Sequence, residues 1–485
     1  MLADDQLENP TPRAREFQVV VLAGHGANLQ PLTNNVSGNT AAKALLPVGN
    51  RPMISYVLHW VEDCGISDVL VVCPSVLKPE ISHHLHRAEY SNMRLELKSV
   101  DEDDVSISGT AEVLRAIEDM IKACYVVVLP CDFMPPPSLS LTELLNAFRE
   151  DANEPVAAVL LYERQIPADG KDKGPKLVVG TDETTNTLLY VDGDNDDDED
   201  LEIHMGLTKE FPNARFTTRY LDSHVYVLRR SILEILREHP GLLSFREEVL
   251  PWVCKLGYRK SKRDRWGTTL KPQDPAFKLA MLHATTHVQR DPLTGMITTS
   301  PTSSEIPQPY DEEFTQEVPK STGSKPLRTA YVVHSAKDGF SGRGNTISGY
   351  MELNRQVLSQ LASKANSTRN TKSSAVGDSV IPTSATVGER ASIKRSVIGE
   401  HCRIGKNVKI QGSVVMDHVE IADGAKLDNC IVSRLCQIGE RAVLKDCEIE
   451  TAFRVPADGE SPMFALKELS QPSRAANMKG EKLET

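Results

Sequence analysis

The sequence predicts two folded units of different class, an α/β domain over residues 17–285 and a parallel β-helix over residues 371–452. The first prediction rests on apolar strand-like runs that alternate with amphipathic helical segments, a pattern typical of a sheet covered by helices. The second rests on aliphatic residues that recur every 17 positions near the C-terminus. Between the two units, more than half of residues 291–326 are Pro, Ser, Thr or Gly, which predicts a linker.

In the front half, short runs of Val, Leu and Ile predict the strands and a helical spacing of apolar residues predicts the helices. Pro52 suits the first position of a helix and Gly65 suits its C-terminal end. Strands are expected at 18–23, 69–73, 125–129 and 156–162, and helices at 52–64 and 110–123. Their alternation predicts a mostly parallel sheet with helices on both faces.

The remaining segments are assigned by composition. Residues 1–16 and 453–485 are polar and are expected to be tails, and residues 286–328 are expected to be a disordered linker. Residues 329–370 are expected to connect the two units and to contain a helix, since apolar residues recur there at a spacing of four.

The repeat near the C-terminus has three columns of Ile, Val or Leu, with steps of six, five and six residues between them. A period this short with three inward aliphatic residues predicts a three-sided coil whose interior they fill. A small residue follows each member of the first column, which suits a tight corner. The columns are Val387, Ile404, Ile421 and Ile438; Ile393, Ile410, Leu427 and Leu444; and Ile398, Val415, Val432 and Ile449; the small residues are Gly388, Gly405, Ala422 and Gly439.

The composition of the chain excludes several classes of protein. Lys plus Arg is 55 and Asp plus Glu is 67, so the net charge of −12 argues against direct nucleic-acid binding through bulk charge. The hydrophobic fraction of 40% excludes a wholly disordered chain. The sequence has no apolar run long enough to span a membrane, no signal peptide, and nine cysteines without metal-ligand spacing. We therefore expect a cytosolic protein with reduced thiols and no membrane partner.

A glycine-rich loop follows the first predicted strand, from Leu22 to Thr33. It lacks the third glycine of a dinucleotide fingerprint and the Gly-Lys-Ser/Thr of a phosphate loop. The loop resembles instead the opening of the nucleotidyltransferases that make sugar nucleotides, as do the segment from Lys43 to Pro52, the triplet beginning at Gly109, and the strand end at Asp132. The hexapeptide columns are similar to those of left-handed β-helix acyltransferases and sugar-nucleotide enzymes. The resemblance implies a Rossmann-like nucleotidyltransferase domain followed by a left-handed parallel β-helix.

The residues also depart from that family. Its chemistry, attack of a sugar phosphate on a nucleoside triphosphate, needs an arginine, a lysine and magnesium around the phosphates. The family's arginine falls on Asn28, and extra residues before Lys43 put its reach to the phosphate site in doubt. Asp132 remains, with Asp222 as a loose match for a second metal ligand. We therefore predict no catalytic residue, no metal site and no required cofactor.

Part of the nucleotide cradle is nevertheless expected to persist, so that a nucleotide or sugar nucleotide could still bind as a regulatory ligand. The possible vestigial nucleotide-binding residues are Gly24, Gly26, Lys43, Gly109, Thr110 and Asp132.

A degraded site on this two-part architecture resembles the γ and ε subunits of eukaryotic translation initiation factor 2B. The short polar tail, the segment beginning at Gly342 and the helix from Tyr350 to Arg355 favour the γ-subunit family over ε. The resemblance implies a non-catalytic scaffold or regulatory subunit of a guanine-nucleotide exchange factor in the cytosol. Its implied partners are the ε subunit, the α, β and δ regulatory subunits, and initiation factor two as substrate of the complex.

Two alternatives remain open. One is an active or regulatory sugar-nucleotide pyrophosphorylase of the mannose-1-phosphate guanylyltransferase type, which the triplet at Gly109, Asp132 and Lys43 would serve. The other is a β-helix acyltransferase, for which His401 and His418 are candidates by residue type alone.

Overall fold

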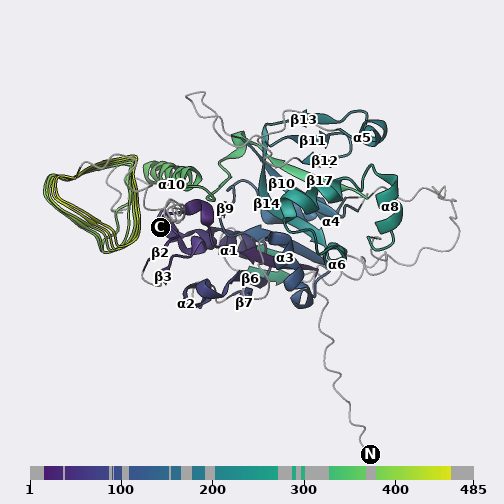
Figure 1. Ribbon diagram of the computed structural model, residues 1–485, viewed down its shortest axis with the longest axis horizontal. Helices are drawn as coiled ribbons and strands as arrows, with labels where there is room; N and C mark the ends of the chain where they lie inside the picture. Colours follow the sequence, from purple (N-terminus) through teal and green to yellow (C-terminus); the bar gives the residue numbers. More distant parts are fainter. Residues whose placement is uncertain are drawn as a thin grey trace, which may run out of the picture.

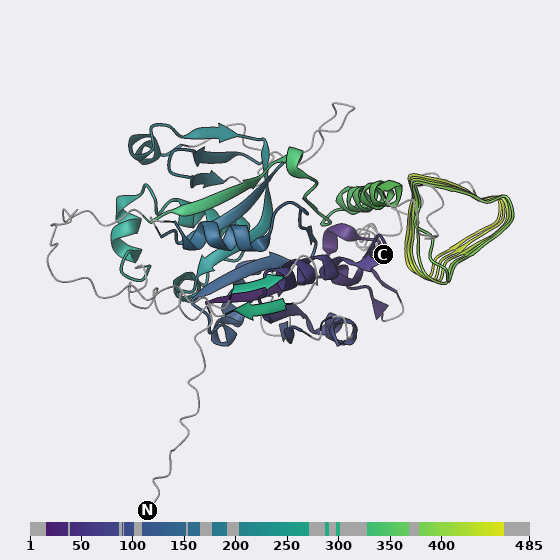
Figure 2. The same ribbon diagram turned by 180° about the vertical axis from the view of Figure 1, so that it is seen from behind.

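The structure is a computed structural model of the chain. Two units lie side by side, with a long helix between them (Figures 1 and 2). The residues that the structure describes are 16–36, 39–86, 90, 92–100, 109–151, 154–164, 177–191, 203–270, 287–290, 297–300, 327–367 and 378–459.

The front unit is built on a 10-stranded sheet with the order β13-β11-β12-β17-β10-β14-β8-β1-β6-β7. Its parallel half contains β1 (Phe17–Leu22), which pairs in parallel with β8 (Tyr125–Pro130) and β6 (Asp68–Pro74). β14 (Tyr220–Arg229) runs antiparallel to its neighbours β8 and β10 (Ala157–Glu163). The predicted α/β class is therefore confirmed, although the sheet is mixed beyond its parallel half.

Alternate residues of the central strands feed two separate cores, one on each face of the sheet. Val19 and Val21 point into the first core, with apolar residues of α1 and α4, whereas Val20 points into the second, with α3, α6 and α7. This is the period-2 alternation of a strand covered on both sides. The helices are α1 (Met53–Asp63), α2 (Lys78–Leu85), α3 (Thr110–Ala116), α4 (Leu141–Arg149), α5 (Met205–Glu210), α6 (Ser231–Glu238), α7 (Leu250–Cys254) and α8 (Lys260–Trp266).

The predicted helix at 110–123 is shorter than expected. It ends at Ala116 and is followed by a 3-10 turn, η5 (Glu118–Met120). The side chain of Gln18 explains this ending, because its amide donates to the carbonyl of Met120 and accepts from the backbone N–H of Lys122. These two bonds satisfy groups that a continuing helix would pair internally.

The front sheet also receives a strand from beyond the predicted linker. β17 (Thr329–His334) pairs in parallel with β10, so the segment assigned to a connection begins inside the front unit. Within the expected linker 286–328, β15 (His287–Arg290) and β16 (Ile297–Ser300) form a hairpin, and most of the rest lies outside the described residues. The remaining strands are β2 (Asn35–Val36), β3 (Asn39–Thr40), β4 (Pro47–Val48), β5 (Arg51–Pro52), β7 (Arg94–Val100), β9 (Phe133–Met134), β11 (Val179–Asp182), β12 (Thr187–Val191), β13 (Arg215–Thr217) and β18 (Gly342–Arg343).

The C-terminal unit is the predicted coil, seen end-on as a triangle in Figure 1. Each side is a parallel sheet whose strands repeat every 17 residues. The three sheets are β19-β22-β25-β28-β31, β20-β23-β26-β29 and β21-β24-β27-β30. Their strands are β19 (Thr386–Val387), β20 (Ser392–Lys394), β21 (Val397–Ile398), β22 (Arg403–Ile404), β23 (Lys409–Gln411), β24 (Val414–Val415), β25 (Glu420–Ile421), β26 (Lys426–Asp428), β27 (Ile431–Val432), β28 (Gln437–Ile438), β29 (Val443–Lys445), β30 (Glu448–Ile449) and β31 (Arg454–Val455).

The three predicted columns fill the interior of this coil, except in its first turn. Val387 is 44% exposed and Ile393 is half-buried, whereas the other ten positions are buried. At the far end the coil continues past the predicted limit, since Val455 of β31 extends the first column and is also buried.

The small residues after the first column have a different cause from the one predicted. Left-handed backbone at that corner falls on Arg390, Asn407 and Arg441, not on Gly405. At Gly405 a Cβ would lie 2.4 Å from the Asp423 carboxylate of the next coil, so the constraint there is close approach between coils.

The two units are joined through α10 (Ile347–Ser367), which Figure 2 shows between them. Tyr350 of this helix is fully buried, and its hydroxyl donates to the carbonyl of Pro47 at 2.5 Å. One apolar cluster spans front unit, helix and coil, and its buried members are Leu29, Leu32, Leu46, Val48, Met53, Met134, Tyr350, Met351, Leu353, Val357, Leu358, Val397, Val414, Met416 and Ile431. None of the helices within the described residues is long and apolar enough to cross a membrane.

Candidate functional site

A cavity of about 420 Å³ opens at the carboxyl ends of β1, β6 and β8. This edge is where ligands bind in open α/β sheets, because the loops that follow parallel strands meet there. The cavity is lined by all of the predicted vestigial residues, namely Gly24, Gly26, Lys43, Gly109, Thr110 and Asp132. Asn28, the position of the missing arginine, lines it as well.

The glycine loop is shaped by its contact with Lys43. Gly26 has a left-handed backbone with φ 75°, and a Cβ there would lie 2.9 Å from the Cβ of Lys43. A side chain at position 26 would therefore push Lys43 out of the cavity. Despite the extra residues before it, Lys43 reaches the strand end at Asp132.

The triplet at Gly109 is held by the segment that precedes the π-helical turn η6 (Phe245–Val249). A Cβ at Gly109 would lie 2.1 Å from the carbonyl oxygen of Leu243, so only glycine fits there. The hydroxyl of Thr110 accepts from the backbone N–H of Phe245 at 3.0 Å. Both residues thus have a structural role in placing this wall of the cavity.

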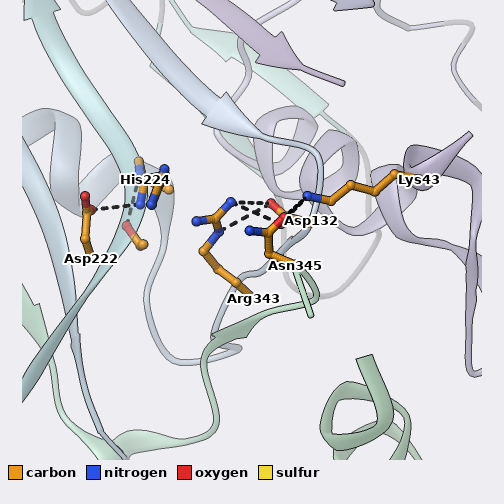
Figure 3. A network of polar contacts seen from close by, with 8 residues as sticks. Lys43, Asp132, Asp222, His224, Arg343 and Asn345 are labelled. Carbon is orange, nitrogen blue, oxygen red and sulfur yellow. Dashed lines mark hydrogen bonds and ion pairs between the residues drawn. The ribbon is translucent and has the colours of Figure 1, made fainter. Parts of the chain in front are cut away.

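The polar centre of the cavity is an ion cluster made by Lys43, Asp132, Arg343 and Asn345 (Figure 3). Lys43 Nζ lies 2.7 Å from Asp132 Oδ2 and donates to Asn345 Oδ1 at 2.5 Å. Arg343 Nη2 lies 3.1 Å from each carboxylate oxygen of Asp132, and its Nε lies 3.4 Å from Oδ1. The two cations approach the carboxylate from different sides, so that each of its oxygens has a cationic donor.

This arrangement fixes the charge of Asp132, which is fully buried. Burial is the largest single influence and raises the pKa, but the charges and hydrogen bonds of Arg343 and Lys43 together outweigh it. They hold the pKa of Asp132 well below its usual range, and the carboxylate stays ionised at neutral pH.

A β-bulge in β14 shapes the wall beside Arg343. The pairing of β10 with β14 shifts between Leu160 and Leu161, and His224 in the bulge has φ 57°. Such a bulge re-aims side chains at the edge of a site. Asp222 Oδ2 accepts from the hydroxyl of Tyr226 at 2.5 Å, and Asp222 Oδ1 accepts from the backbone N–H of His224 at 2.8 Å.

His224 is a neutral group in this wall. Burial lowers its pKa, and the charge of Arg343 lowers it further, to about 4. The imidazole therefore carries no charge at neutral pH and adds nothing to the positive side of the cluster.

These contacts test whether the family's magnesium fits. Asp132 has both oxygens committed to cationic donors, and Asp222 has both committed to protein donors. Among the described residues, there is no group of three or more His, Cys, Asp or Glu side chains placed to hold a metal ion. Magnesium requires free oxygen ligands in an octahedral set, so the residues present do not fit it.

Sequence reasoning missed the two members of the cluster that come from the far side of the linker. Arg343 and Asn345 belong to the segment that favoured the γ-subunit family, but no role in the pocket was assigned to them. The general expectation that points to them is that a buried aspartate at the end of a strand needs a cationic partner. No spacing rule reveals it, because 211 positions separate Arg343 from Asp132.

The other candidate residues lie away from this cavity. His401 and His418 stack on each other at left-handed corners of the coil, with ring centroids 5.1 Å apart. Successive corners of the repeat account for that stacking without any catalytic role.

Comparison with known families agrees with the geometry. The family model described as nucleotidyl transferase matches residues 18–169, which contain the glycine loop and Asp132. The family model described as EIF2B subunit epsilon LbH domain matches residues 361–458, which contain the coil. The fold and site thus define a nucleotidyltransferase-type domain joined to a left-handed β-helix, as predicted.

Individual relatives narrow this class. The chain is 33% identical over 251 residues to "Translation initiation factor eIF2B subunit gamma" of Schizosaccharomyces pombe, covering 51% of this chain and 53% of the relative. It is 30% identical over 243 residues to the protein of that name in Caenorhabditis elegans, covering 49% and 57%. It is 26% identical over 422 residues to the one in Dictyostelium discoideum, covering 79% and 87%.

The matched region spans about half the length of the first two of these relatives and most of the third. The chain is a homologue of eIF2B gamma subunits, and the resemblance recognised in its sequence is confirmed.

Proposed function

We propose that this chain is a non-catalytic scaffold or regulatory subunit of the guanine-nucleotide exchange factor that converts initiation factor two from its GDP-bound to its GTP-bound form. The observation that carries the proposal is the ion cluster, in which Arg343 and Lys43 together saturate the carboxylate of Asp132. The names of the relatives supply the complex to which such a subunit would belong.

The argument against catalysis is one of charge. Nucleotidyl transfer needs a metal and a free cation aimed at the α-phosphate, where negative charge develops. Here Asp132 neutralises one of the two cations in the cluster, and position 28 carries an amide in place of the family's arginine. An amide has no fixed charge and no fork of donors, so it does not replace that clamp.

The proposed partners follow from the same assignment. They are the ε subunit, with which this chain would pair, and the α, β and δ subunits in the cytosol. The continuous apolar cluster through α10 supports a scaffold role, because it fixes the β-helix on the front unit as one body.

The test is a tagged pull-down from native cytosol, followed by mass spectrometry of the intact assembly. We expect recovery with the other exchange-factor subunits at fixed stoichiometry. Recovery of the chain by itself, or as a homo-oligomer, would overturn the proposal.

The competing function is sugar-nucleotide synthesis, which the match to the nucleotidyl transferase family favours. It predicts magnesium-dependent release of pyrophosphate from a nucleoside triphosphate and a sugar phosphate, abolished by Asp132→Asn. Turnover by the purified chain that this substitution removes would establish the enzyme and end the non-catalytic proposal.

We further propose that the cavity holds a nucleotide or sugar nucleotide as a regulatory ligand. Its apolar wall includes Val72, Val113 and Leu114, which suit a base, and the cluster at the other end suits phosphates. Titration calorimetry with GTP, ATP and GDP-mannose tests this, and the absence of heat at millimolar ligand would contradict it.

A further inference from the structure

We propose that Arg343 is a built-in replacement for the divalent cation of this pocket. As a consequence, the pocket accepts the phosphates of a nucleotide in metal-free form. The first statement stands on the cluster alone, whereas the second rests on the proposed regulatory ligand.

The guanidinium lies where a metal bound to Asp132 would have to lie. Its Nε and Nη2 face both carboxylate oxygens at 3.1–3.4 Å, and Lys43 Nζ takes the remaining side of Oδ2. The side chain of Asp132 is 1% exposed, and that of Arg343 is 15% exposed. A second cation at this carboxylate would have to displace one of the first two, in a site where solvent screens their repulsion poorly.

The backbone holds Arg343 in this position. β18 pairs with β9, and the register sets Arg343 opposite Phe133, the residue after Asp132. The backbone N–H of Gly344 donates to the carbonyl of Asp132 at 2.8 Å. Arg343 is thus tied to the strand end by main chain as well as side chain, and the main-chain bonds keep its guanidinium within reach of the carboxylate.

The charge of the cluster selects the ligand. Lys43 and Arg343 contribute two positive charges and Asp132 one negative charge, and all three residues line the cavity. Within the described part of the chain, Arg343 Nη1 donates no hydrogen bond, so this nitrogen remains available for a phosphate oxygen. Magnesium cancels part of the negative charge of a nucleotide's phosphates and so weakens their attraction to this net positive cluster, which favours the metal-free ligand.

The first experiment measures metal binding without any nucleotide. Mn²⁺ is titrated into the full chain and followed by electron paramagnetic resonance, for the unaltered chain, Arg343→Gln, Arg343→Lys and Arg441→Gln. Arg441 is the matched control, because it also pairs with an aspartate, Asp458, but is 69% exposed on the coil.

We expect no Mn²⁺ site tighter than about 1 mM in the unaltered chain, the control or Arg343→Lys, which keeps the charge. Arg343→Gln should gain one site, and adding Asp132→Asn should remove it. An Mn²⁺ site in the unaltered chain that Asp132→Asn abolishes would overturn the proposal. So would a folded Arg343→Gln variant that gains no site.

The second experiment uses the unaltered chain, so that it does not depend on any variant folding. GTP is titrated by calorimetry in EDTA and in excess magnesium. We expect affinity in EDTA at least equal to that in magnesium, and a gain of roughly threefold or more from magnesium would refute metal-free binding. No heat in either buffer refutes the ligand but not the replacement of the cation, which the Mn²⁺ titration then decides.

Discussion

Replacing Asp132 with Asn tests the ion cluster most directly. The substitution keeps the shape of the side chain but removes the charge that Lys43 and Arg343 share. Their side chains are only 9% and 15% exposed, so both cations would be left poorly solvated. Removing one partner from a buried ion pair costs about 3–5 kcal/mol, and we expect a loss of that size in the free energy of unfolding.

The assay can be confined to the front unit. The three tryptophans of the chain, Trp60, Trp252 and Trp266, all lie there, so that denaturant unfolding followed by tryptophan fluorescence reports on this unit. The control is Glu183→Gln, which breaks an ion pair with Arg215 whose side chains are 58% and 70% exposed. Exposed pairs contribute about 0–1 kcal/mol, so the control should change little.

The pH dependence sharpens the test. The pKa of Asp132 is lowered in the folded chain, so its stabilisation is present above the unfolded pKa and is lost only as pH falls through the lower folded value. The difference between Asp132→Asn and the unaltered chain should therefore be the same at about pH 7 and about pH 5. If Asp132→Asn lowers the free energy of unfolding by less than about 1 kcal/mol, no more than the control does, the three charges do not behave as a buried ion cluster and the reasoning is refuted.

Three further predictions concern other parts of the structure. In the β-helix, Leu427→Ala should lower the free energy of unfolding by about 2–5 kcal/mol, whereas Val387→Ala in the exposed first coil should lower it by under about 1 kcal/mol. Denaturant unfolding followed by circular dichroism measures both losses. Equal losses would contradict the difference in burial between the first coil and the later ones. Tyr350→Phe leaves the buried carbonyl of Pro47 without its donor and should lower the free energy of unfolding by about 1–3 kcal/mol. Limited proteolysis should then cut the chain between the two units at a higher rate. An unchanged digestion rate would argue against this contact. The pKa of His224 is lowered from 6.5 to about 4, so the free energy of unfolding should fall by up to about 3 kcal/mol as pH falls across that window. His224→Gln should flatten this pH dependence of stability. An unaltered pH profile in the variant would show that His224 is not its source.

The fold was largely predictable, because the spacing of apolar residues along the sequence determines which elements form. A 17-residue repeat with three aliphatic columns leaves one arrangement that buries them all, and residues such as Leu427 and Val432 are buried as expected. The corners were less predictable. Position 405 needs a small residue because the next coil approaches closely, and that spacing between coils has no local sequence signal.

The pocket was predictable only in part. Its sequence-local motifs, the glycine loop and the triplet at Gly109, lie on the wall of the cavity because they follow strands or begin a helix. Its charge was not predictable, since Arg343 arrives through β18 from a segment far along the chain. A lone arginine in a short irregular stretch is most often a surface residue, and only the pairing with β9 gives it a partner.

The turn that carries Lys43 also contacts the β-helix. Lys43 begins the 3-10 turn η2 (Lys43–Leu45), and the carbonyl of Leu45 accepts from Arg434 of the coil at 3.4 Å. Arg434 also lies 3.5 Å from Glu80, which accepts from the backbone N–H of Ala42. The turn that carries Lys43 is therefore held by the β-helix on one side and by Asp132 on the other. The same short turn thus contributes a cation to the polar centre of the cavity and a backbone acceptor to the contact between the front unit and the β-helix.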